Sequence, residues 1–569
     1  MKAPKAPRAR AALPFIALVT LLQGCASQAP IASFTAPNGQ YTPAEVTPTP
    51  LNTPAGTCDG AFAPVELAHF TQPSTEVVHQ FESNGTGVAV NDLNNDGLLD
   101  IVLANIDGPS SIFWNRGEFA FDKQELNDSF ARAVNILDVD GDGWMDISFT
   151  HIKVGPSYWH NTGVLGADGT AAFEHASLPG VNQYAHSMAW ADLNGDNQLD
   201  LVTGVYDAEL NTMPGGQFLF TDGAGVLVYT QKDGRFTAQR LAKQSQALVI
   251  ALLDVTGDDR PDILIGNDFD TPDMAWQNTP AGWQEFQPWQ RSSQHTMSYD
   301  WADIDNNGSF EFFATDMYPY QVDLDELAQW VPMMNKMPHR LSNIDVQRAQ
   351  NVLQIPDGKG GFSEEADVRG VLATGWGWSS HFGDLDNDGY QDLYSVNGMI
   401  DQQIFGYLPG GELVEQNQAF VNQRDGRFGP MPQWNLGGKY SGRGMVLADL
   451  NNDGALDAVI NNLRNPAQVY KNQLCQGSAL EVDLAWPGSG NTRAIGAKVL
   501  LHTSAGSQLR DVRASSAYLS GDPARVHFGI ADGTQLLGME IRWPDGAVTR
   551  LDGVDGGALQ AGSLLRVTR

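Results

Sequence analysis

Asp138-Val-Asp140-Gly-Asp142-Gly-Trp-Met-Asp146, followed at once by Ile147-Ser-Phe-Thr150, is the stretch that decides the fold of this 569-residue chain. Side-chain oxygens occupy positions 1, 3, 5 and 9 of this phrase, and an apolar, strand-like segment follows it. Four such oxygens can converge on one hard cation, with a backbone carbonyl at position 7 completing the shell, which is the chemistry that Ca²⁺ prefers. The stretch therefore predicts a calcium loop that joins two strands.

The same phrase, D-x-[DNT]-x-[DN]-[GDN]-x-x-[DE], occurs seven times, so we expect about seven bound Ca²⁺. The predicted metal ligands are, copy by copy, Asp92, Asn94, Asp96 and Asp100; Asp138, Asp140, Asp142 and Asp146; Asp192, Asn194, Asp196 and Asp200; Asp254, Thr256, Asp258 and Asp262; Asp303, Asp305, Asn307 and Glu311; Asp384, Asp386, Asp388 and Asp392; and Asp449, Asn451, Asp453 and Asp457. An EF-hand begins similarly but requires Glu at position 12 and flanking helices. No copy has that Glu, so we exclude an EF-hand.

The spacing of the copies indicates the architecture. The residue two places before the first Asp is apolar in every copy, which marks a buried strand entering each loop. Successive copies begin between 46 residues apart (Asp92 to Asp138) and 81 residues apart (Asp303 to Asp384), enough for a four-stranded sheet each. We therefore predict an all-β chain with a seven-bladed β-propeller, a repeat architecture that protects its strand edges.

Several motifs carry a family resemblance. The seven phrases resemble the FG-GAP or VCBS-type calcium repeats of integrin-α-like propellers, and Thr374-Gly-Trp-Gly-Trp-Ser379 before the sixth copy resembles the cartilage acidic protein family. Beyond Cys475, the stretches Asn491–Lys498 and Ile541–Gly546, with Tyr518-Leu-Ser and His527-Phe-Gly-Ile, resemble the ASPIC and UnbV domain that follows the propeller in that family. The resemblance implies a propeller over 61–475, a small β-rich domain over 476–569 and a binding role.

The N-terminal region has the pattern of an exported lipoprotein. A basic start and a short apolar stretch lead to Leu22-Gln-Gly-Cys25, which predicts a signal peptide over 1–24 and lipidation of Cys25. An uncleaved membrane anchor is the alternative, although the apolar stretch is short for a span. Residues 25–60 are rich in Pro and poor in apolar residues, so we expect a tether. The expected location is the cell envelope, lipid-anchored at the outer membrane, on either face.

Cys58 and Cys475 are the other cysteines, and they flank the seven phrases. This placement favours a disulfide that closes the propeller in an oxidising compartment, with two free thiols as the alternative. The last repeat is one strand short, and the segment from Ala63 to Phe81 can supply it.

A polar ring is the candidate ligand site. Equivalent positions, six residues before the first Asp of each copy, include Arg132, His186, Trp378 and Arg443, with Trp376 two residues before Trp378. Such side chains suit an anionic or sugar-like ligand at the channel mouth opposite the calcium loops. Polar residues that simply pack around the axis are the alternative. Three residues before the first Asp, Asp300 and His381 of adjacent repeats are expected to pair, and the insertions 325–334, 344–353 and 412–420 to form short helices.

The net charge of −33 argues against nucleic acid as a partner. No nucleophile elbow, HExxH helix, phosphate loop or dinucleotide fingerprint occurs, so no catalytic residue is assigned. We expect recognition of a protein or glycan at the cell envelope. An enzyme acting on an extracellular polysaccharide or other polymer, with its site at the propeller mouth, and a structural envelope component are the alternatives.

Overall fold

The computed structural model describes residues 31, 33–53, 58–73, 77–78, 81–210, 212–213, 217–218, 223–269, 271–321, 323–335, 347–553 and 559–569. The predicted signal peptide 1–24 and the lipidation site Cys25 lie outside them. Within the described part of the chain, no helix is both long enough and apolar enough to cross a membrane.

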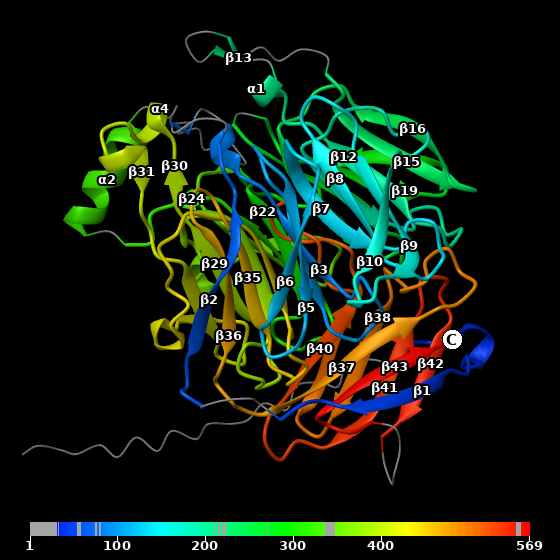
Figure 1. Cartoon of the computed structure of the whole chain (residues 1–569). Coiled ribbons are helices and arrows are strands. Elements are labelled where there is room, and N and C mark those ends of the chain that lie inside the picture. Colours follow the sequence, from blue (N-terminus) through cyan, green and yellow to red (C-terminus); the bar gives the residue numbers. More distant parts are fainter. Residues whose placement is uncertain are drawn as a thin grey trace, which may run out of the picture.

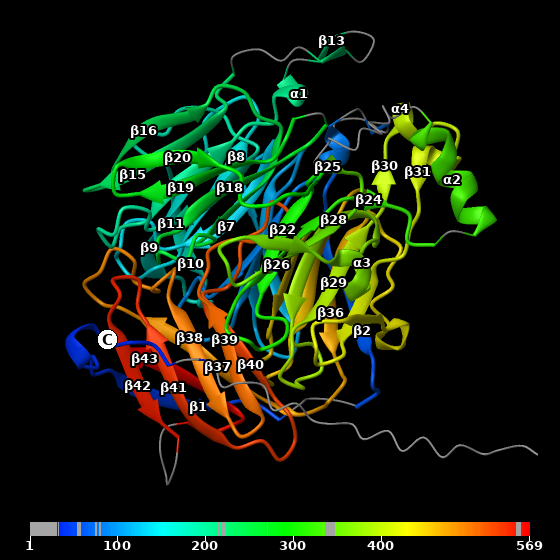
Figure 2. The same ribbon diagram turned by 180° about the vertical axis from the view of Figure 1, so that it is seen from behind.

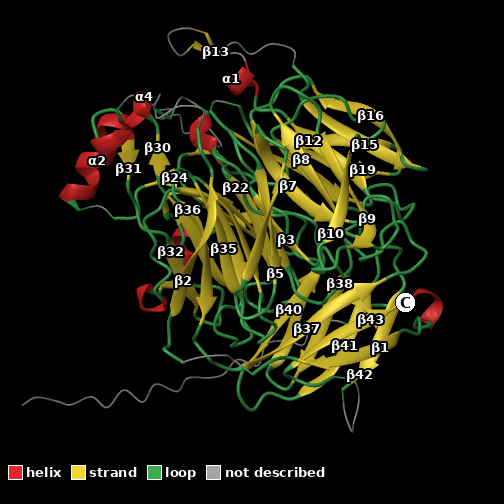
Figure 3. Cartoon of the chain, viewed as in Figure 1, coloured by secondary structure: helices red, strands yellow, loops and turns green. Residues whose placement is uncertain are grey.

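Seven antiparallel sheets form the larger body, six with four strands and that of the sixth blade with a fifth, short strand, β24 (Met317–Tyr318), added at its inner edge, which confirms the predicted seven-bladed propeller (Figures 1 and 3). The first strand of each blade is innermost, and neighbouring innermost strands contact one another around the central axis. In order from inner to outer strand, the blades are β3 (Val88–Asn91), β4 (Asp100–Leu103), β5 (Ser110–Asn115) and β6 (Phe121–Leu126); β7 (Ala131–Leu137), β8 (Asp146–His151), β9 (Ser157–Leu165) and β10 (Ala171–Ala176); β11 (Ser187–Ala191), β12 (Asp200–Gly204), β15 (Val226–Lys232) and β16 (Arg235–Ala242); β17 (Ala247–Leu253), β18 (Asp262–Asn267), β19 (Met274–Thr279) and β20 (Gly282–Phe286); β22 (Ser298–Ala302), β23 (Glu311–Thr315), β26 (Val352–Pro356) and β27 (Phe362–Glu364); β28 (Gly375–Gly383), β29 (Asp392–Asn397), β32 (Gln418–Asn422) and β33 (Phe428–Pro430); and β34 (Gly442–Ala448), β35 (Asp457–Asn462), β36 (Pro466–Asn472) and β2 (Phe62–Phe70).

The seventh blade is completed from the other end of the chain. Strand β2 pairs antiparallel with β36, with Phe62 opposite Asn472, so the N-terminal side supplies the missing outer strand. A disulfide joins Cys58 to Cys475 beside this pairing, with a Cα–Cα distance of 5.5 Å. The ring is thus closed both by a shared sheet and by a covalent bond.

A second, smaller β domain lies against one end of the propeller. The helices α1 (Asp207–Leu210), α2 (Leu324–Met334) and α4 (Gln402–Phe405) lie at the opposite end (Figures 1 and 2). The eight strands of this domain form two sheets, and an apolar core continues from them into the propeller. The sheets are β1 (Glu45–Pro50), β43 (Ser563–Thr568), β37 (Ser478–Ala485) and β40 (Arg525–Ile530); and β39 (Gly506–Asp511), β38 (Lys498–Thr503), β41 (Leu536–Arg542) and β42 (Val548–Asp552).

The expectation that residues 25–60 form a tether needs correction, because they include strand β1. Residues 25–60 are not a spacer throughout, because Glu45–Pro50 pairs antiparallel with β43 at the edge of the C-terminal domain. Pro48 and Pro50 are two residues apart, so both face the same side of the strand, and an edge strand tolerates proline where its missing N–H points away from the sheet. Residues on either side add backbone hydrogen bonds, from Thr42 N to Val548 O and from Leu51 N to Gly562 O.

The long insertions are only partly helical. The helix expected at 325–334 is present as α2 (Leu324–Met334), capped by Asp323. The other two expectations were wrong where the structure describes them, because 352–356 forms β26 and 418–422 forms β32, each the third strand of a blade. Pairing with the second strand of the blade therefore outweighs the local helix propensity of these segments. The remaining short elements are α1 (Asp207–Leu210), α3 (Ala366–Arg369), α4 (Gln402–Phe405), η1 (Pro37–Gly39), η2 (Glu82–Asn84), η3 (Pro409–Gly411), η4 (Pro432–Trp434), β13 (Thr212–Met213), β14 (Gln217–Phe218), β21 (Ser292–Ser293), β24 (Met317–Tyr318), β25 (Gln347–Arg348), β30 (Met399–Ile400) and β31 (Glu412–Leu413).

Candidate functional site

The seven acidic phrases form the loops between the first and second strands of the blades. In each loop the first carboxylate accepts the backbone N–H groups of positions 5 and 6. In the sixth loop these are Asp388 N to Asp384 Oδ1 at 3.0 Å and Gly389 N to Asp384 Oδ2 at 2.7 Å. The carboxylate of position 9, Asp392, accepts Leu385 N at 2.9 Å. Backbone donors therefore hold every loop closed with its acidic side chains gathered inside.

Burial disfavours the ionised form of these carboxyl groups unless a positive charge lies beside them. Burial, followed by repulsion from neighbouring aspartates, raises the pKa of Asp386 to about 6 and that of Asp392 well above its usual range. Ligand atoms of Asp384, Asp386 and Asp392 lie within 4.8 Å of one another, as do those of Asp303, Asp305 and Glu311. A bound divalent cation would reverse this penalty.

Several buried side-chain oxygens of the loops have no hydrogen-bond partner among the described residues, which suits the binding of a hard cation there. Glu311 Oε1, Asp386 Oδ1 and Asn451 Oδ1 are buried and accept no hydrogen bond in the described structure. Buried polar atoms normally have a partner, so an acceptor left over among carboxylates is suited to a metal ion. Carboxylate and amide oxygens are the donors that Ca²⁺ takes, and the residues present fit it.

Two basic side chains already lie on carboxylates of the fourth loop, whereas in the sixth loop one basic side chain, Arg424, pairs with Asp388. Arg260 forms an ion pair with Asp258 within the loop. Lys498 of the C-terminal domain places Nζ 4.0 Å from Asp254 Oδ2. These cationic groups neutralise carboxylates that would otherwise be free for a metal ion.

An amide residue on the third strand, which the sequence analysis did not single out, links neighbouring blades. Asn161 Nδ2 donates to Leu93 O of the preceding blade at 2.8 Å and to Met145 O of its own loop at 3.0 Å. Five further residues donate to a loop carbonyl of the preceding blade in the same way: Asn115, Gln231, Asn278, Asn422 and Asn472. In the first, second and seventh repeats this Asn stands fifteen residues after the last Asp of the phrase, a regularity that was visible in the sequence. The fifth blade has Pro356 at this position and lacks the link.

Four of the five predicted ligand residues converge, but around a side chain of the protein rather than around open space. Arg132, His186, Trp378 and Arg443 are each exposed by no more than 2%. The Arg443 guanidinium lies 4.2 Å above the Trp378 ring, and burial lowers the pKa of Arg443 to about 9. Arg132 forms an ion pair with Glu209 of α1, and His186 Nδ1 lies 3.3 Å from the same carboxylate.

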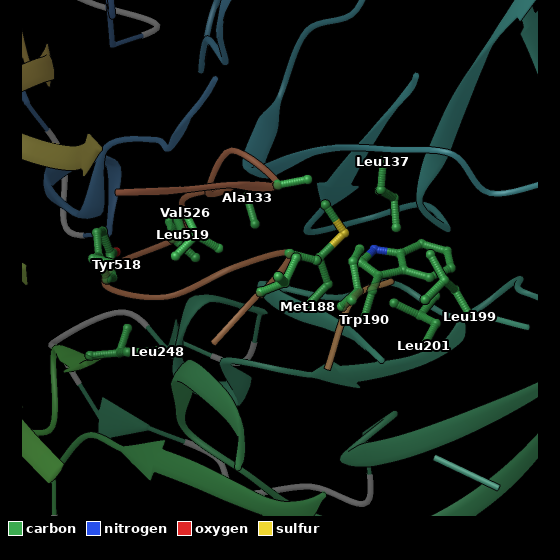
Figure 4. Packing of buried hydrophobic residues seen from close by; sticks show 14 of the residues in the cluster. Ala133, Leu137, Met188, Trp190, Leu199, Leu201, Leu248, Tyr518, Leu519 and Val526 are labelled. Atoms are coloured by element: carbon green, nitrogen blue, oxygen red, sulfur yellow. The ribbon is translucent and has the colours of Figure 1, made fainter. Parts of the chain in front are cut away.

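Tyr518 of the C-terminal domain occupies the centre of this ring. Its ring centroid is 5.2 Å from that of Trp378, its hydroxyl donates to Asn84 O at 3.0 Å, and it is fully buried. Figure 4 shows Leu519, the residue after Tyr518, near Ala133 of the inner strand β7, and the Val134 amide donates to Leu519 O at 3.2 Å. Among the residues that the structure describes, the ring therefore surrounds Tyr518 and not an open channel mouth. A ligand role for the ring stays a prediction. The fifth candidate, Trp376, lies elsewhere, between Trp330 and Phe405.

Residues 513–524, which we call the finger, run through the propeller channel from the end where the acidic loops lie. The Gly521 amide donates to Val88 O and the Ala517 amide to Tyr299 O, at 3.0 and 2.7 Å, so the finger adds backbone pairing to two blades. Gly521 allows this approach, since a Cβ there would lie 2.9 Å from the Cβ of Ala89.

Asp300 and His381 form the expected pair, and the base of the finger contacts both residues. His381 Nδ1 is 3.1 Å from Asp300 Oδ2, and its Nε2 is 2.9 Å from Asp522 Oδ1 of the finger. Burial opposes the charge on His381, but the two carboxylates outweigh it and raise its pKa to about 10. Arg513 adds a second bond to Asp300 at 2.6 Å.

The open candidate site is a cleft of about 630 Å³ at the strand ends opposite the acidic loops, which we call the rim cleft. Phe130, 54% exposed, and Val154, 61% exposed, flank it. Below them, the buried Asp128 accepts Trp159 Nε1 at 2.7 Å and lies 3.3 Å from His151 Nε2. Phe130 has φ 59°, the left-handed region that bulky residues seldom adopt. Its N–H donates to Ile106 O at 2.9 Å, which helps to keep the ring pointing outward.

The fold and its loops define the class of protein. The profile of FG-GAP-like repeats matches residues 92–149, 138–203 and 409–460, and that of the ASPIC and UnbV domain matches residues 488–560. The chain therefore combines an FG-GAP-type β-propeller with an ASPIC and UnbV domain.

Among individual proteins, the chain is a distant relative of cartilage acidic protein 1 of Mus musculus, 24% identical over 534 residues that span 82% of this chain and 72% of that protein. This agrees with the family that the motifs resemble. Similar solved structures include an Agrocybe aegerita lectin described as recognising non-reducing terminal N-acetylglucosamine, at 15% identity and TM-score 0.39, covering 68% of this chain and 94% of that one. Rhamnogalacturonan lyase YesW follows at 12% identity and TM-score 0.35, covering 75% and 76%. These two likenesses are too weak to carry a functional argument.

Proposed function

We propose that this chain is a calcium-stabilised propeller that recognises a protein or glycan at the cell envelope, with the rim cleft as its binding site. The observation that carries the proposal is the exposed Phe130, held in a strained backbone conformation beside a cleft of about 630 Å³. Strain of this kind costs about 1–3 kcal/mol and is most often kept at functional sites. The volume is in the range of small-ligand sites, and an apolar face above polar groups suits a sugar ring or a peptide side chain.

Recognition is favoured over the second candidate, a polymer-active enzyme. Glycoside hydrolysis ordinarily needs two carboxyl groups on opposite sides of the scissile bond. Among the residues that line the rim cleft, Asp128 is the single acid. Its Oδ2 already accepts hydrogen bonds from Trp159 and Ser157, and its Oδ1 lies 3.3 Å from His151 Nε2. The cleft therefore has the parts of a binding site and lacks a catalytic pair.

The N-terminal segment supports an envelope location with the rim cleft facing away from the membrane. Phe34 N donates to Glu540 Oε2 of the C-terminal domain at 2.6 Å, so the chain leaves the folded body on that side. If Cys25 carries lipid, the nine residues to Phe34 span at most about 30 Å. The lipid would then hold the C-terminal domain near the bilayer and present the opposite end of the propeller.

Calcium has a supporting role in this proposal. The seven loops bind divalent cations, and the fourth is the weakest because Arg260 and Lys498 already lie on its carboxylates. Binding to the folded state alone stabilises a protein by mass action, so chelation is expected to lower the melting temperature.

The test is binding of the mature chain to glycan arrays and to envelope proteins, with saturating Ca²⁺ and with chelator. Phe130→Ala is expected to weaken retention about tenfold, which corresponds to about 1.4 kcal/mol. Tyr407→Ala is the matched control, because Tyr407 is an exposed aromatic residue (41%) away from the cleft. Retention that survives Phe130→Ala, or release of a cleaved product, would overturn the proposal, and absence of any ligand would favour the structural role.

A further inference from the structure

The second acidic loop contains a nitrogen donor. His160 of β9 places Nδ1 3.3 Å from Asp140 Oδ2 and 3.3 Å from Asp146 Oδ1. Its side chain is 29% exposed, whereas the Asp146 side chain is fully buried, so the group is open to solvent on one side. The three ligand atoms lie within 4.8 Å of one another. The imidazole thus faces the two carboxylates as a third donor.

The other six blades have no histidine, cysteine or acidic residue at this point of the sheet. In the second blade Ile147 pairs with Trp159, so Asp146 lies opposite His160, one residue further along. The same register puts the following residues opposite position 9 in the other blades: Trp114, Thr230, Gln277, Ile355, Val421 and Lys471. Histidine at the position opposite the last acidic residue therefore occurs in the second blade and is not a feature of the repeat.

We propose that the second loop binds a divalent first-row transition-metal ion, zinc in the first instance, through His160 Nδ1, Asp140 and Asp146, in place of calcium. The proposal rests on the proposed function in one respect, that these loops are cation sites. Ca²⁺ takes oxygen ligands, whereas imidazole nitrogen suits zinc and its neighbours in the transition series.

The separations of the donor atoms fit this choice. Zinc binds nitrogen and carboxylate oxygen at about 2.0–2.1 Å in tetrahedral sites, which puts neighbouring donors about 3.3–3.4 Å apart. Both N···O separations in the loop are 3.3 Å. Tyr158 donates its hydroxyl to Asp146 Oδ2 at 2.9 Å, the kind of outer contact that orients a metal-bound carboxylate.

The experiment titrates Zn²⁺ calorimetrically into the mature full-length protein in excess Ca²⁺, and repeats the titration with Co²⁺ while recording its visible absorption. The expected result is one site per chain, with the absorption of a nitrogen-ligated cobalt ion. His160→Ala should weaken this site about a hundredfold or more, since even losing an outer contact costs 10–100-fold. His175→Ala, which removes an exposed histidine of the same blade, is the matched control and should leave zinc binding unchanged.

A second substitution, which replaces the nitrogen donor by a carboxylate, tests the choice of metal directly. His160→Asp converts the loop to an all-oxygen set, so it should lose the zinc site and gain one calcium site. The inference is overturned if the wild-type protein takes up no Zn²⁺ in excess Ca²⁺, or if His160→Ala binds Zn²⁺ as well as the wild type does. A chain that binds no Ca²⁺ at any loop would instead refute the calcium proposal, so the two failures are distinguishable.

Discussion

Tyr518→Ala tests whether the finger holds the two domains together. Tyr518 is fully buried among Trp378, Arg443 and His186, and its hydroxyl bonds to Asn84 O at 3.0 Å. Replacing a buried aromatic ring by Ala costs about 3–5 kcal/mol. Tyr518→Phe keeps the ring and loses one hydrogen bond, leaving a carbonyl without its donor, for about 1–2 kcal/mol. The packing of the ring should therefore dominate the anchoring of the finger.

Hydrogen exchange of the finger amides measures this difference. The Ala517 and Gly521 amides donate to propeller carbonyls, so they exchange when the finger withdraws. At 1.4 kcal/mol per factor of ten, protection should fall about a hundredfold to a few thousandfold in Tyr518→Ala and about tenfold in Tyr518→Phe. Equal protection in both variants and the wild type would refute the idea that Tyr518 anchors the finger.

The same variant examines the predicted ring site. Removing the Tyr518 ring exposes Arg132, His186, Trp378 and Arg443 to a ligand that could not reach them before. If the ring binds ligand, Tyr518→Ala should raise retention on the arrays, and Trp378→Ala should abolish the increase. Unchanged retention in Tyr518→Ala would leave the rim cleft as the binding site.

Three further predictions follow from local geometry. His381 titrates with a pKa of about 10 when folded, above its ordinary 6.5, so the stability it provides is complete below pH 6.5 and is lost as the pH rises towards 10. The melting temperature at saturating Ca²⁺ should therefore fall across that range, and less steeply in His381→Gln; parallel curves would contradict this. Arg260→Ala removes the ion pair with Asp258 and should tighten calcium binding of the fourth loop about tenfold in calorimetry, whereas an identical titration would show that Arg260 does not compete. Peptide mapping without reductant should recover Cys58 linked to Cys475, and Cys58→Ser should destabilise the ring by about 6 kcal/mol at most in the chain-entropy model; free thiols in exported protein would rule the bond out.

Features that depend on residues close together in the chain were predictable. Each acidic phrase is nine contiguous residues whose carboxylates meet within one turn, so the repeated pattern indicated both the loops and the blades. The closing strand was predictable for a related reason, because the last repeat visibly lacked one strand and Phe62–Phe70 supplied it. The linking residues Asn115, Asn161 and Asn472 also stand at a regular distance, fifteen residues after the last Asp of their phrases.

Contacts between distant segments were decided only by the tertiary structure. Tyr518 belongs to a domain far along the chain from the inner strands it touches, so nothing local indicates that it fills the ring. His160 meets Asp140 and Asp146 only through the register of a strand pairing, and Glu45–Pro50 becomes a strand only because β43 offers an edge. The physical reason is that hydrophobic burial and sheet pairing act between whichever surfaces the folded chain brings together. The sequence alone thus determined the repeat, its acidic loops and its ring closure. The burial of the predicted ligand ring and the approach of His160 to the second loop arose from packing between distant segments.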